Sequence, residues 1–317
     1  DRPLRPLFPK DLRNDVAVVN TVMSVDQDNS PEVAALLGSS IALSISDIPF
    51  NGPIGGVVLG LIDGEVIINP DSKQREKSEM YVTLAGTKEK IVMIEAGANE
   101  VPDEIMLDAI KKGHVEIKKI VEFIEGIVKE IGKPKFEYQS ADVPEEVMNA
   151  VKEFAYGRMR EAVLAVDKQV RDENIKKLTD ETKEHLLEAF PEMESVISEA
   201  MYKLEKKVVR EYLLEEGKRV DGRRLDEIRP LSAEVGLLPR VHGSGLFQRG
   251  QTQVLTSVTL GAMGDVQMLD GIEIEDTKRY MHHYNFPGYS VGEAKTSRGP
   301  GRREIGHGAL AERALEP

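Results

Sequence analysis

The sequence contains no cysteine among its 317 residues. Disulfide bonds are therefore excluded, and so are metal sites built from thiolates. A chain without cysteine suits a reducing compartment, and we expect a cytoplasmic protein.

Long apolar runs are also missing. No stretch approaches the roughly 20 consecutive apolar residues of a membrane-spanning helix, and the first residues lack the basic and apolar segments of a signal peptide. We therefore expect no membrane contact. The chain starts at Asp1 rather than Met and stops at Pro317 within a helical pattern. We expect it to be an internal piece of a longer protein.

Positive charge is scarce overall, with 42 Lys and Arg against 55 Asp and Glu and a formal net charge of −13. This excludes a protein that coats nucleic acid with its whole surface. The last part of the chain differs, because residues 217–317 carry 14 basic and 13 acidic side chains, a net charge of +1. Within it, Lys295, Arg298, Arg302 and Arg303 fall inside nine positions. Such a local basic region can bind RNA on an acidic body, because salt screens charges beyond about 10 Å.

The first part of the chain alternates strand and helix patterns. Asp63-Gly64 is a strong hairpin signal between two apolar runs. The order of elements indicates an α+β or α/β fold. We predict a strand at 15–25, a buried helix at 31–46, the hairpin strands at 55–62 and 65–69, strands at 80–85 and 91–96, and an amphipathic helix at 102–131.

The middle of the chain has a different composition. Gly132-Lys133-Pro134 ends the preceding helix. Residues 144–216 carry dense Glu and Lys at helical spacing, which predicts three helices with solvated charged faces. A second α/β segment follows, with strands at 245–248, 251–261 and 278–286. We therefore predict a first core at 1–134, an all-α domain at 143–216 and a second core at 220–317.

The strongest candidate site is Gly301-Arg302-Arg303-Glu304-Ile305-Gly306-His307. Two adjacent arginines offer forked, permanently charged donors that suit phosphate oxygens. They stand where a Gly- and Pro-rich loop leads into a predicted helix, whose N-terminal amides favour an anion. The alternative interpretation is a solvated basic loop without a ligand.

Five motifs are spread over the chain. They are Asp1-Arg2-Pro3-Leu4-Arg5-Pro6-Leu7-Phe8-Pro9, Ile48-Pro49-Phe50-Asn51-Gly52-Pro53-Ile54-Gly55, Val220-Asp221-Gly222-Arg223, His242-Gly243-Ser244-Gly245-Leu246-Phe247-Gln248-Arg249-Gly250-Gln251-Thr252-Gln253 and His283-Tyr284-Asn285-Phe286-Pro287. In order and spacing they resemble the polynucleotide phosphorylases, also called polyribonucleotide nucleotidyltransferases, over essentially the whole chain. The resemblance implies two partial ribonuclease-PH-like cores, of the ribosomal-protein-S5-domain-2-like βαβ type, joined by an all-α domain.

The resemblance also implies roles for single residues. Arg302 and Arg303 match the family's arginine pair at the RNA path. His307 lies one helical turn after Arg303 on the same face, and by the resemblance it points toward the phosphate pocket; the alternative is a histidine that packs the helix. Arg249, at a turn between strands, either reaches the same cleft or lies in solvent. These four are the predicted RNA- and phosphate-binding residues, and we expect no complete catalytic set and no metal ligands in the chain.

The first core contains an altered version of the family's site. Where an active copy has a glycine and a run of serines, this chain has Asp28-Asn29-Ser30-Pro31-Glu32. Proline lacks an N–H donor, and Glu32 would repel phosphate. Where active aspartates would stand, Glu79 matches one carboxylate and Lys73 falls near the place of the other. We predict that the first core is chemically silent.

The two ends of the chain carry a short repeat. Asp1-Arg2-Pro3-Leu4-Arg5-Pro6 and Glu312-Arg313-Ala314-Leu315-Glu316-Pro317 share the pattern acid-Arg-x-Leu-x-Pro. The two-core organisation implied by the resemblance requires a match at these positions.

The resemblance implies the activity of the longer protein. It would degrade mRNA by phosphorolysis from the 3′ end, releasing nucleoside diphosphates, with inorganic phosphate as co-substrate. The implied metal is Mg²⁺ or Mn²⁺, held downstream of this chain, and the implied partners are single-stranded RNA, two further copies in a homotrimer, and other RNA-degradation proteins. The alternative is a non-catalytic RNA-binding subunit of an exosome-like ring. We predict that the chain alone is inactive.

Overall fold

The computed structural model describes residues 1–272, 277–296 and 298–316. The chain forms two compact units, one made of residues 1–140 together with 261–317 and the other of residues 141–260. The secondary structure is α+β with antiparallel sheets, which confirms the predicted fold class. The predicted domains 1–134, 143–216 and 220–317 are segments defined by sequence pattern, whereas the two units are defined by how the folded chain packs. The domain bounds therefore stay a prediction.

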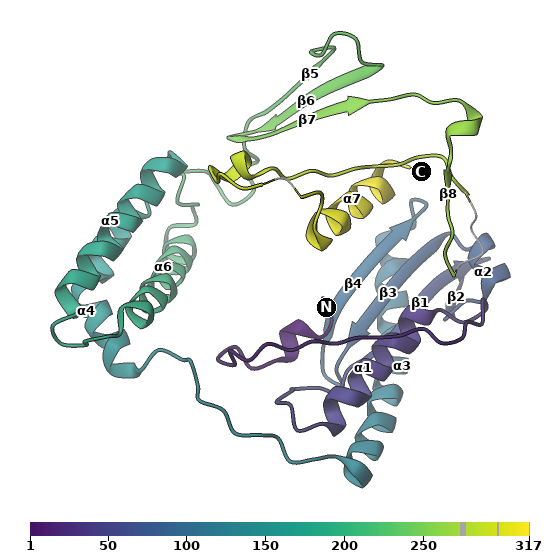
Figure 1. The fold of residues 1–317 in the computed structure, drawn as a ribbon, viewed down its shortest axis with the longest axis horizontal. Coiled ribbons are helices and arrows are strands. Elements are labelled where there is room, and N and C mark those ends of the chain that lie inside the picture. The colour runs from purple at the N-terminus through teal and green to yellow at the C-terminus, as the bar shows by residue number, and fades with distance from the viewer. Residues whose placement is uncertain (273–276, 297, 317) are drawn as a thin grey trace. The chain divides into compact units, whose positions relative to one another are not determined.

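The first unit contains an antiparallel sheet with the strand order β2-β1-β3-β4 (Figure 1). The predicted hairpin is confirmed, since Asp63 and Gly64 join its first two strands with φ angles of 51° and 79°. Positive φ at both central residues is what a tight hairpin turn requires. The strands are β1 (Gly55–Ile62), β2 (Glu65–Ile68), β3 (Met80–Gly86) and β4 (Ile91–Ala98).

Helices α3 (Asp103–Ile131) and α1 (Pro31–Ile45) cover opposite faces of this sheet. Two neighbouring glycines of β1 allow the two helices to approach the sheet closely. A Cβ on Gly55 would lie 3.1 Å from the Ile117 carbonyl oxygen of α3, and one on Gly56 would lie 2.3 Å from a methyl group of Leu36 in α1. Successive residues of a strand point to opposite faces. The sheet and α3 share a fully buried core that includes Leu59, Leu84 and Ile117.

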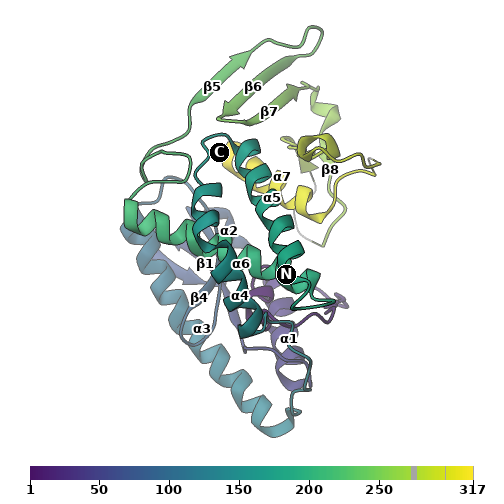
Figure 2. The same cartoon turned by 90° about the vertical axis from the view of Figure 1, so that its left-hand side faces the viewer.

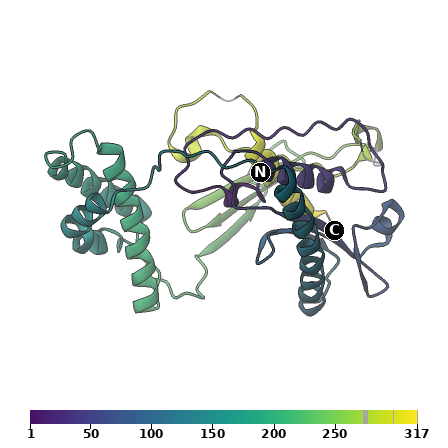
Figure 3. The same cartoon turned by 90° about the horizontal axis from the view of Figure 1, so that it is seen from below.

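The strand predicted at 15–25 was wrong. Residues 15–25 form no strand and run as a long extended loop before α1 (Figure 3). Val19 and Met23 in this loop are 84% and 88% exposed. A strand pattern becomes a strand only where another strand pairs its backbone groups. Helix α2 (Ser72–Lys77) was not predicted. It begins with a capping box in which the side chains of Asp71 and Gln74 accept each other's backbone amides at 2.8 and 2.9 Å.

The later part of the first unit has little regular structure before its last helix. The strand predicted at 278–286 is wrong beyond its first residue, because only β9 (Thr277–Lys278) pairs, with β8 (Gln267–Met268). Short 3₁₀ turns lie at Arg5–Leu7, Met263–Asp265 and Gly288–Val291. Helix α7 (Arg302–Leu315) then ends the described chain.

The second unit contains the predicted helices α4 (Glu145–Ala162), α5 (Lys168–Leu186) and α6 (Glu194–Glu216), which lie side by side (Figure 2). They share a core of buried side chains that includes Val151, Met159, Ile197 and Leu204. The Asp167 carboxylate caps α5 by accepting the amides of Gln169 and Val170 at 2.7 and 3.2 Å. No helix in the described residues is long and apolar enough to cross a membrane.

The second unit also holds an antiparallel sheet in the order β5-β6-β7. Its strands are β5 (Leu231–Val235), β6 (Gly243–Arg249) and β7 (Thr252–Val258). The predictions at 245–248 and 251–261 correspond to β6 and β7 with shifted ends, and β5 was not predicted. Apolar side chains of this sheet, such as Val235 at 86% and Leu255 at 56%, are exposed.

Candidate RNA interface

Helix α7 begins where the sequence predicted a helix N-terminus. Gly301 is the N-cap residue, and its amide donates to the Glu304 carboxylate at 3.0 Å. The first intrahelical bond runs from the Ile305 amide to the Gly301 carbonyl at 3.1 Å. The amides of Arg302, Arg303 and Glu304 therefore precede the regular bonding pattern and are available to an external anion.

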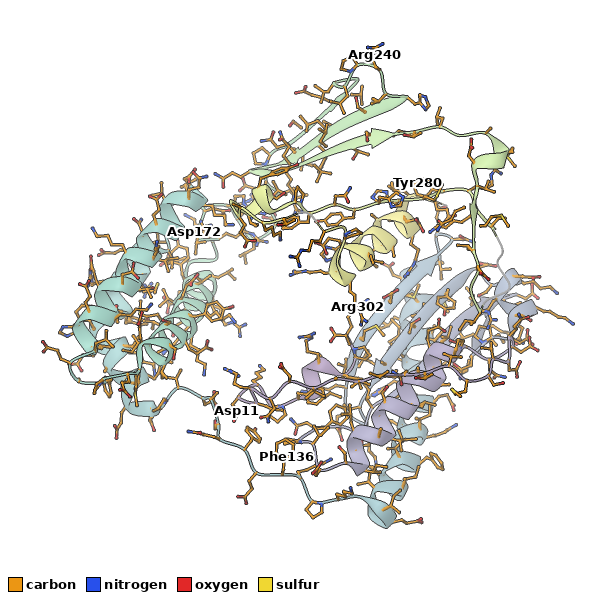
Figure 4. The ribbon with its side chains drawn as sticks, viewed as in Figure 1. Asp11, Phe136, Asp172, Arg240, Tyr280 and Arg302 are labelled. Atoms are coloured by element: carbon orange, nitrogen blue, oxygen red, sulfur yellow. The ribbon has the colours of Figure 1, made fainter. Side chains whose placement is uncertain are left out.

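Arg302 and Arg303 occupy the first two positions of α7, and both are exposed. Figure 4 labels Arg302 at the start of the helix. Among the described residues neither has an ion pair or a hydrogen bond from its guanidinium group. Two free guanidinium groups beside free helix amides form a surface that is complementary to phosphate. The RNA contact itself stays a prediction.

A glycine lets α7 pack closely on the segment that precedes it. Gly308 is the buried residue of this helix. A Cβ at this position would lie 3.2 Å from the His282 carbonyl oxygen and 3.5 Å from Tyr284. Glycine inside a helix costs about 1 kcal/mol relative to alanine, and close backbone contact explains its presence here.

His307 lies on the same helix as the arginine pair, one turn after Arg303. Its ring meets the edge of the Tyr284 ring at 85°, with 5.3 Å between the ring centroids, while the residue as a whole remains exposed. The structure thus brings three of the four predicted residues onto the first turns of α7. A histidine that touches Tyr284 and still faces solvent fits the packing and the phosphate interpretations equally, so its role stays a prediction.

Glu312 anchors the other end of α7. Its carboxylate pairs with the Lys278 ammonium group and accepts the His282 amide at 2.9 Å. Burial by itself raises the pKa of the Glu312 carboxyl, but the bonds from Lys278 and His282 outweigh it and hold that pKa below its ordinary value. Glu312 is therefore ionised at neutral pH and holds the helix in place.

The fourth predicted residue, Arg249, lies elsewhere in the fold. It is the exposed last residue of β6, next to the turn at Gly250, in the second unit. Its neighbour Gln251 donates from its side-chain amide to the Asp167 carboxylate at 3.0 Å. Placement of Arg249 in the same cleft as Arg302 stays a prediction.

The altered site of the first core forms a small cavity. It has a volume of about 170 Å³, lies at the start of α1, and is lined by Asp28, Ser30, Asn69 and Arg75 together with apolar side chains. The Arg75 guanidinium donates to the carbonyl oxygens of Pro70 and Gln27 at 3.0 and 2.6 Å. The positively charged Arg75 side chain in this cavity is thus already hydrogen-bonded to backbone carbonyl groups.

A carboxylate that lines the cavity, Asp28, and a carboxylate of the first turn of α1, Glu32, are also engaged. The Ser30 hydroxyl donates to the Glu32 carboxylate at 2.6 Å. Asp28 accepts the Ser72 hydroxyl at 2.5 Å, and this bond lowers the pKa of the Asp28 carboxyl. The Asp28 carboxylate on the cavity wall disfavours inorganic phosphate there, and the silence of the first core stays a prediction.

Family models match the chain in three consecutive parts. Residues 52–116 match the 3′ exoribonuclease family, domain 2. Residues 146–224 match the polyribonucleotide nucleotidyltransferase RNA-binding domain, and residues 227–317 match the 3′ exoribonuclease family, domain 1. Curated relatives with the name polyribonucleotide nucleotidyltransferase match along the whole chain, and the protein from Ruminiclostridium cellulolyticum is 79% identical over 317 residues.

The chain belongs to the polyribonucleotide nucleotidyltransferase family. Relatives of the same name from Caldicellulosiruptor saccharolyticus and Clostridioides difficile are 61% and 59% identical, each over 100% of this chain. The chain spans about half the length of these relatives, at 45 to 46%. A solved structure of rice (Oryza sativa) Rrp46 matches 33% of this chain and 51% of its own, with 17% identity and a TM-score of 0.31, and carries no weight here.

A direct test of the prediction that the first core is silent uses Glu79, the acid that the resemblance places at a catalytic position. Glu79 is exposed between α2 and β3. In a full-length protein, meaning one of the relatives' length that contains this sequence, Glu79→Gln is expected to change the turnover number less than twofold. The measurement is RNA phosphorolysis at saturating substrate, with a check of the assembly by light scattering. A loss above about 100-fold, or about 2.7 kcal/mol of barrier, would show that this core is active.

Two residues that position α7 were not found from the sequence. Gly308 carried a usable signal, because a glycine inside a helical pattern indicates close approach of another backbone. Glu312 carried none, since an acid near the C-terminal end of a helix is ordinary surface composition. Its partners Lys278 and His282 lie about 30 residues earlier in the sequence, and only the folded chain brings them next to Glu312.

Proposed function

We propose that the full-length protein is a phosphate-dependent 3′-to-5′ exoribonuclease that shortens mRNA and releases nucleoside diphosphates. The observation that carries the proposal is the match of the whole chain to relatives named polyribonucleotide nucleotidyltransferase, at identities of up to 79%. The exposed arginine pair at the start of α7 supports it, because such a surface suits an RNA backbone.

The reaction transfers a nucleotidyl group. An oxygen of inorganic phosphate attacks the last phosphorus atom of the RNA, the 3′ oxygen of the preceding nucleotide leaves and takes a proton, and a nucleoside diphosphate is released. In this chain we assign Arg302 and Arg303 to hold the RNA phosphates so that attack can be in line. His307 and Arg249 are proposed to lie near the same path.

The resemblance implies a divalent cation, which would need several carboxylate or imidazole ligands close together. Within residues 1–272, 277–296 and 298–316, no three side chains of His, Asp or Glu come together in a way that could hold a metal ion. The described part of the chain does not fit Mg²⁺ or Mn²⁺, and we derive no step through such an ion. We keep the proposal that its ligands belong to a part of the full-length protein outside this chain.

The finer features remain proposals of the same kind. They are a homotrimeric assembly, single-stranded RNA as substrate, further RNA-degradation proteins as partners, and a cytoplasmic location. The name of the family model at residues 146–224, an RNA-binding domain, supports the RNA substrate. The alternative, a non-catalytic subunit of an exosome-like ring, is not favoured because the relatives are named as nucleotidyltransferases.

A product assay tests the proposal. The full-length protein is incubated with oligo(A), inorganic phosphate and Mg²⁺, and the nucleotides released are separated by chromatography. We expect ADP, and ADP formation should require phosphate. Release of AMP would identify a hydrolase instead, and the absence of any product with intact RNA binding would favour the non-catalytic subunit.

The same assay applied to the chain of residues 1–317 is expected to give no ADP. The physical reason is that its described residues assemble no set of acids able to hold a metal ion, and that its first-core cavity is lined by the Asp28 carboxylate. The control is the same reaction mixture without protein. ADP clearly above that background would contradict the prediction.

A further inference from the structure

We propose that the outer face of helix α6 is a binding site for single-stranded RNA, built from Tyr202, Lys206 and Arg210. The proposal rests on the function proposed above, because it adds a second RNA contact to the arginine pair of α7. The sequence predicts solvated charged faces for the three helices of residues 144–216. One face of α6 differs from a solvated face in what its cations touch.

The three residues form one row along α6. They stand four positions apart within the helix Glu194–Glu216, and residues four apart lie one above the other on the same face. All three are exposed. The side chains with which α6 enters the core of its domain are Ile197, Ala200, Met201, Leu204 and Val208. These lie on the other side of the helix, so the row faces away from the core.

The cations of the row are not paired with acids. The Lys206 ammonium group lies 4.1 Å from the centroid of the Tyr202 ring, a cation–π contact, and no carboxylate of the described residues lies within ion-pair distance of it. The Arg210 guanidinium group has neither an ion pair nor a hydrogen bond in the part of the chain that the structure describes. Both charges therefore remain available to an external anion.

The acids that flank these cations in the sequence interact with other groups. Burial and the nearby Asp172 carboxylate of α5 raise the pKa of the Glu205 carboxyl. The Glu211 carboxylate accepts the Tyr156 hydroxyl at 2.9 Å and pairs with Lys207 at 3.6 Å. Neither carboxylate lies within ion-pair distance of the row.

Helix stability does not explain the row. Lys206 and Arg210 stand four positions apart, where two like charges repel each other and destabilise a helix. A cation in the last turn of a helix would complement its dipole, but the last turn of α6 holds no basic residue. Residues 203–210 nevertheless contain four basic side chains and one acid. An arrangement of charge that opposes helix formation indicates a ligand of the opposite sign.

Single-stranded RNA matches this arrangement. Proteins that hold single strands combine cations along the backbone with aromatic rings on which bases stack. Tyr202 is 50% exposed and supplies the ring, while Lys206 and Arg210 supply cations on successive turns. An acidic peptide would use the cations only. The similarity to the polyribonucleotide nucleotidyltransferase RNA-binding domain extends over the whole of α6, which supports RNA as the ligand.

The site depends on a single domain. Helices α4, α5 and α6 share a core of their own, in which Val151, Met159, Ile197 and Leu204 are buried. The three residues of the row belong to one helix, so their spacing does not change with the arrangement of the exoribonuclease cores. The chain of residues 1–317 contains this whole domain and is therefore suitable for the test.

A single tryptophan tests the aromatic contact. The sequence contains no tryptophan, so in the chain of residues 1–317 the fluorescence of Tyr202→Trp reports on that position alone. Titration with oligo(A) should quench it in a saturable way, because adenine stacks on the indole ring. An abasic ribose-phosphate oligomer of the same charge should not quench it. Lys176→Trp, at an exposed position of α5, is the matched control and should not respond to either.

The cations are tested in the same background. When Lys206→Ala and Arg210→Ala are added to Tyr202→Trp, the apparent Kd for oligo(A) should rise about tenfold. The slope of log K against log salt should fall by one to two units, at about 0.7 for each lost phosphate contact. The control adds Lys176→Ala and Lys177→Ala instead, which removes two exposed charges that have no ion pair among the described residues. That control should change the Kd less than twofold.

Circular dichroism of every variant should match the parent chain, because all the exchanged side chains are exposed. Fluorescence of Tyr202→Trp that oligo(A) leaves unchanged, an equal quench of Lys176→Trp, or a Kd that does not depend on the two cations would overturn the site. An equal quench by the abasic oligomer would show a contact without base stacking and would also overturn it. If the full-length protein makes no ADP, the proposed function fails, whereas the quench still decides the RNA site on α6.

Discussion

RNA affinity of the full-length protein is expected to fall about 10- to 100-fold when Arg302 and Arg303 are both changed to alanine. Each arginine is exposed at the start of α7 with a guanidinium group that the described residues leave free. Phosphate contacts carry no base identity, so the loss should be the same for poly(A) and poly(U). Each lost contact should reduce the slope of log K against log salt by about 0.7 for single strands, hence by one to two units for the pair.

The measurement is the binding constant of short poly(A) and short poly(U) at three salt concentrations. The matched control removes the same two charges from α3 by Lys111→Ala and Lys118→Ala, which are exposed and have no ion pair among the described residues. Arg→Lys at both sites should restore the salt slope more than the phosphorolysis rate, because lysine keeps the charge without the forked geometry. An unchanged slope, or a loss confined to one RNA, would exclude the phosphate contact.

Stability of the first core should collapse when Gly113 is replaced by valine. Gly113 is buried in α3, where a Cβ would lie 2.8 Å from a methyl group of Leu84 and 3.0 Å from one of Leu59. Both leucines are fully buried in the sheet, so the added atoms have no space to enter. Overpacking of this kind costs about 1–3 kcal/mol, and more where a helix must move off its sheet. We expect the upper end of this range.

Chemical denaturation of this chain, followed by circular dichroism, measures the effect. The matched control is Gly126→Ala in the same helix, where an added Cβ meets nothing within 4 Å. Because alanine favours a helix over glycine, that variant should be more stable by about 0.5–1 kcal/mol. A Gly113→Val chain as stable as the parent would mean that α3 does not pack on the sheet as described.

The sequence was sufficient to predict those helices and turns whose conformation is set by residues close together in the chain. The long helix α3 was predicted at 102–131 and found at Asp103–Ile131, because its apolar residues recur at helical spacing. The β1–β2 hairpin followed from Asp63-Gly64, whose backbone conformation does not depend on distant residues. The start of α7 was placed correctly for the same reason, since Gly301 and the Glu304 carboxylate form the cap within four residues.

Strand predictions were wrong where a strand would have needed a partner strand from a distant part of the chain. Residues 15–25 have the composition of a strand but remain an unpaired loop, and residues 279–286 likewise form no strand. Helix α2 was missed although Asp71 and Gln74 stand at the spacing of a capping box, because its six residues include no apolar side chain and so show no helical periodicity. Strand formation is decided by pairing, which composition does not reveal.

The sequence by itself determined the family, the α+β class, the helices and hairpin with local signals, and the exposed arginine pair with His307 one turn later. The tertiary structure alone decided what holds that pair in place. Gly308 packs against the backbone at His282, and Glu312 binds Lys278 and the His282 amide. The physical reason is that a capped helix needs only neighbouring residues, whereas a carboxylate that anchors a helix needs the folded chain to bring its partners within bonding distance.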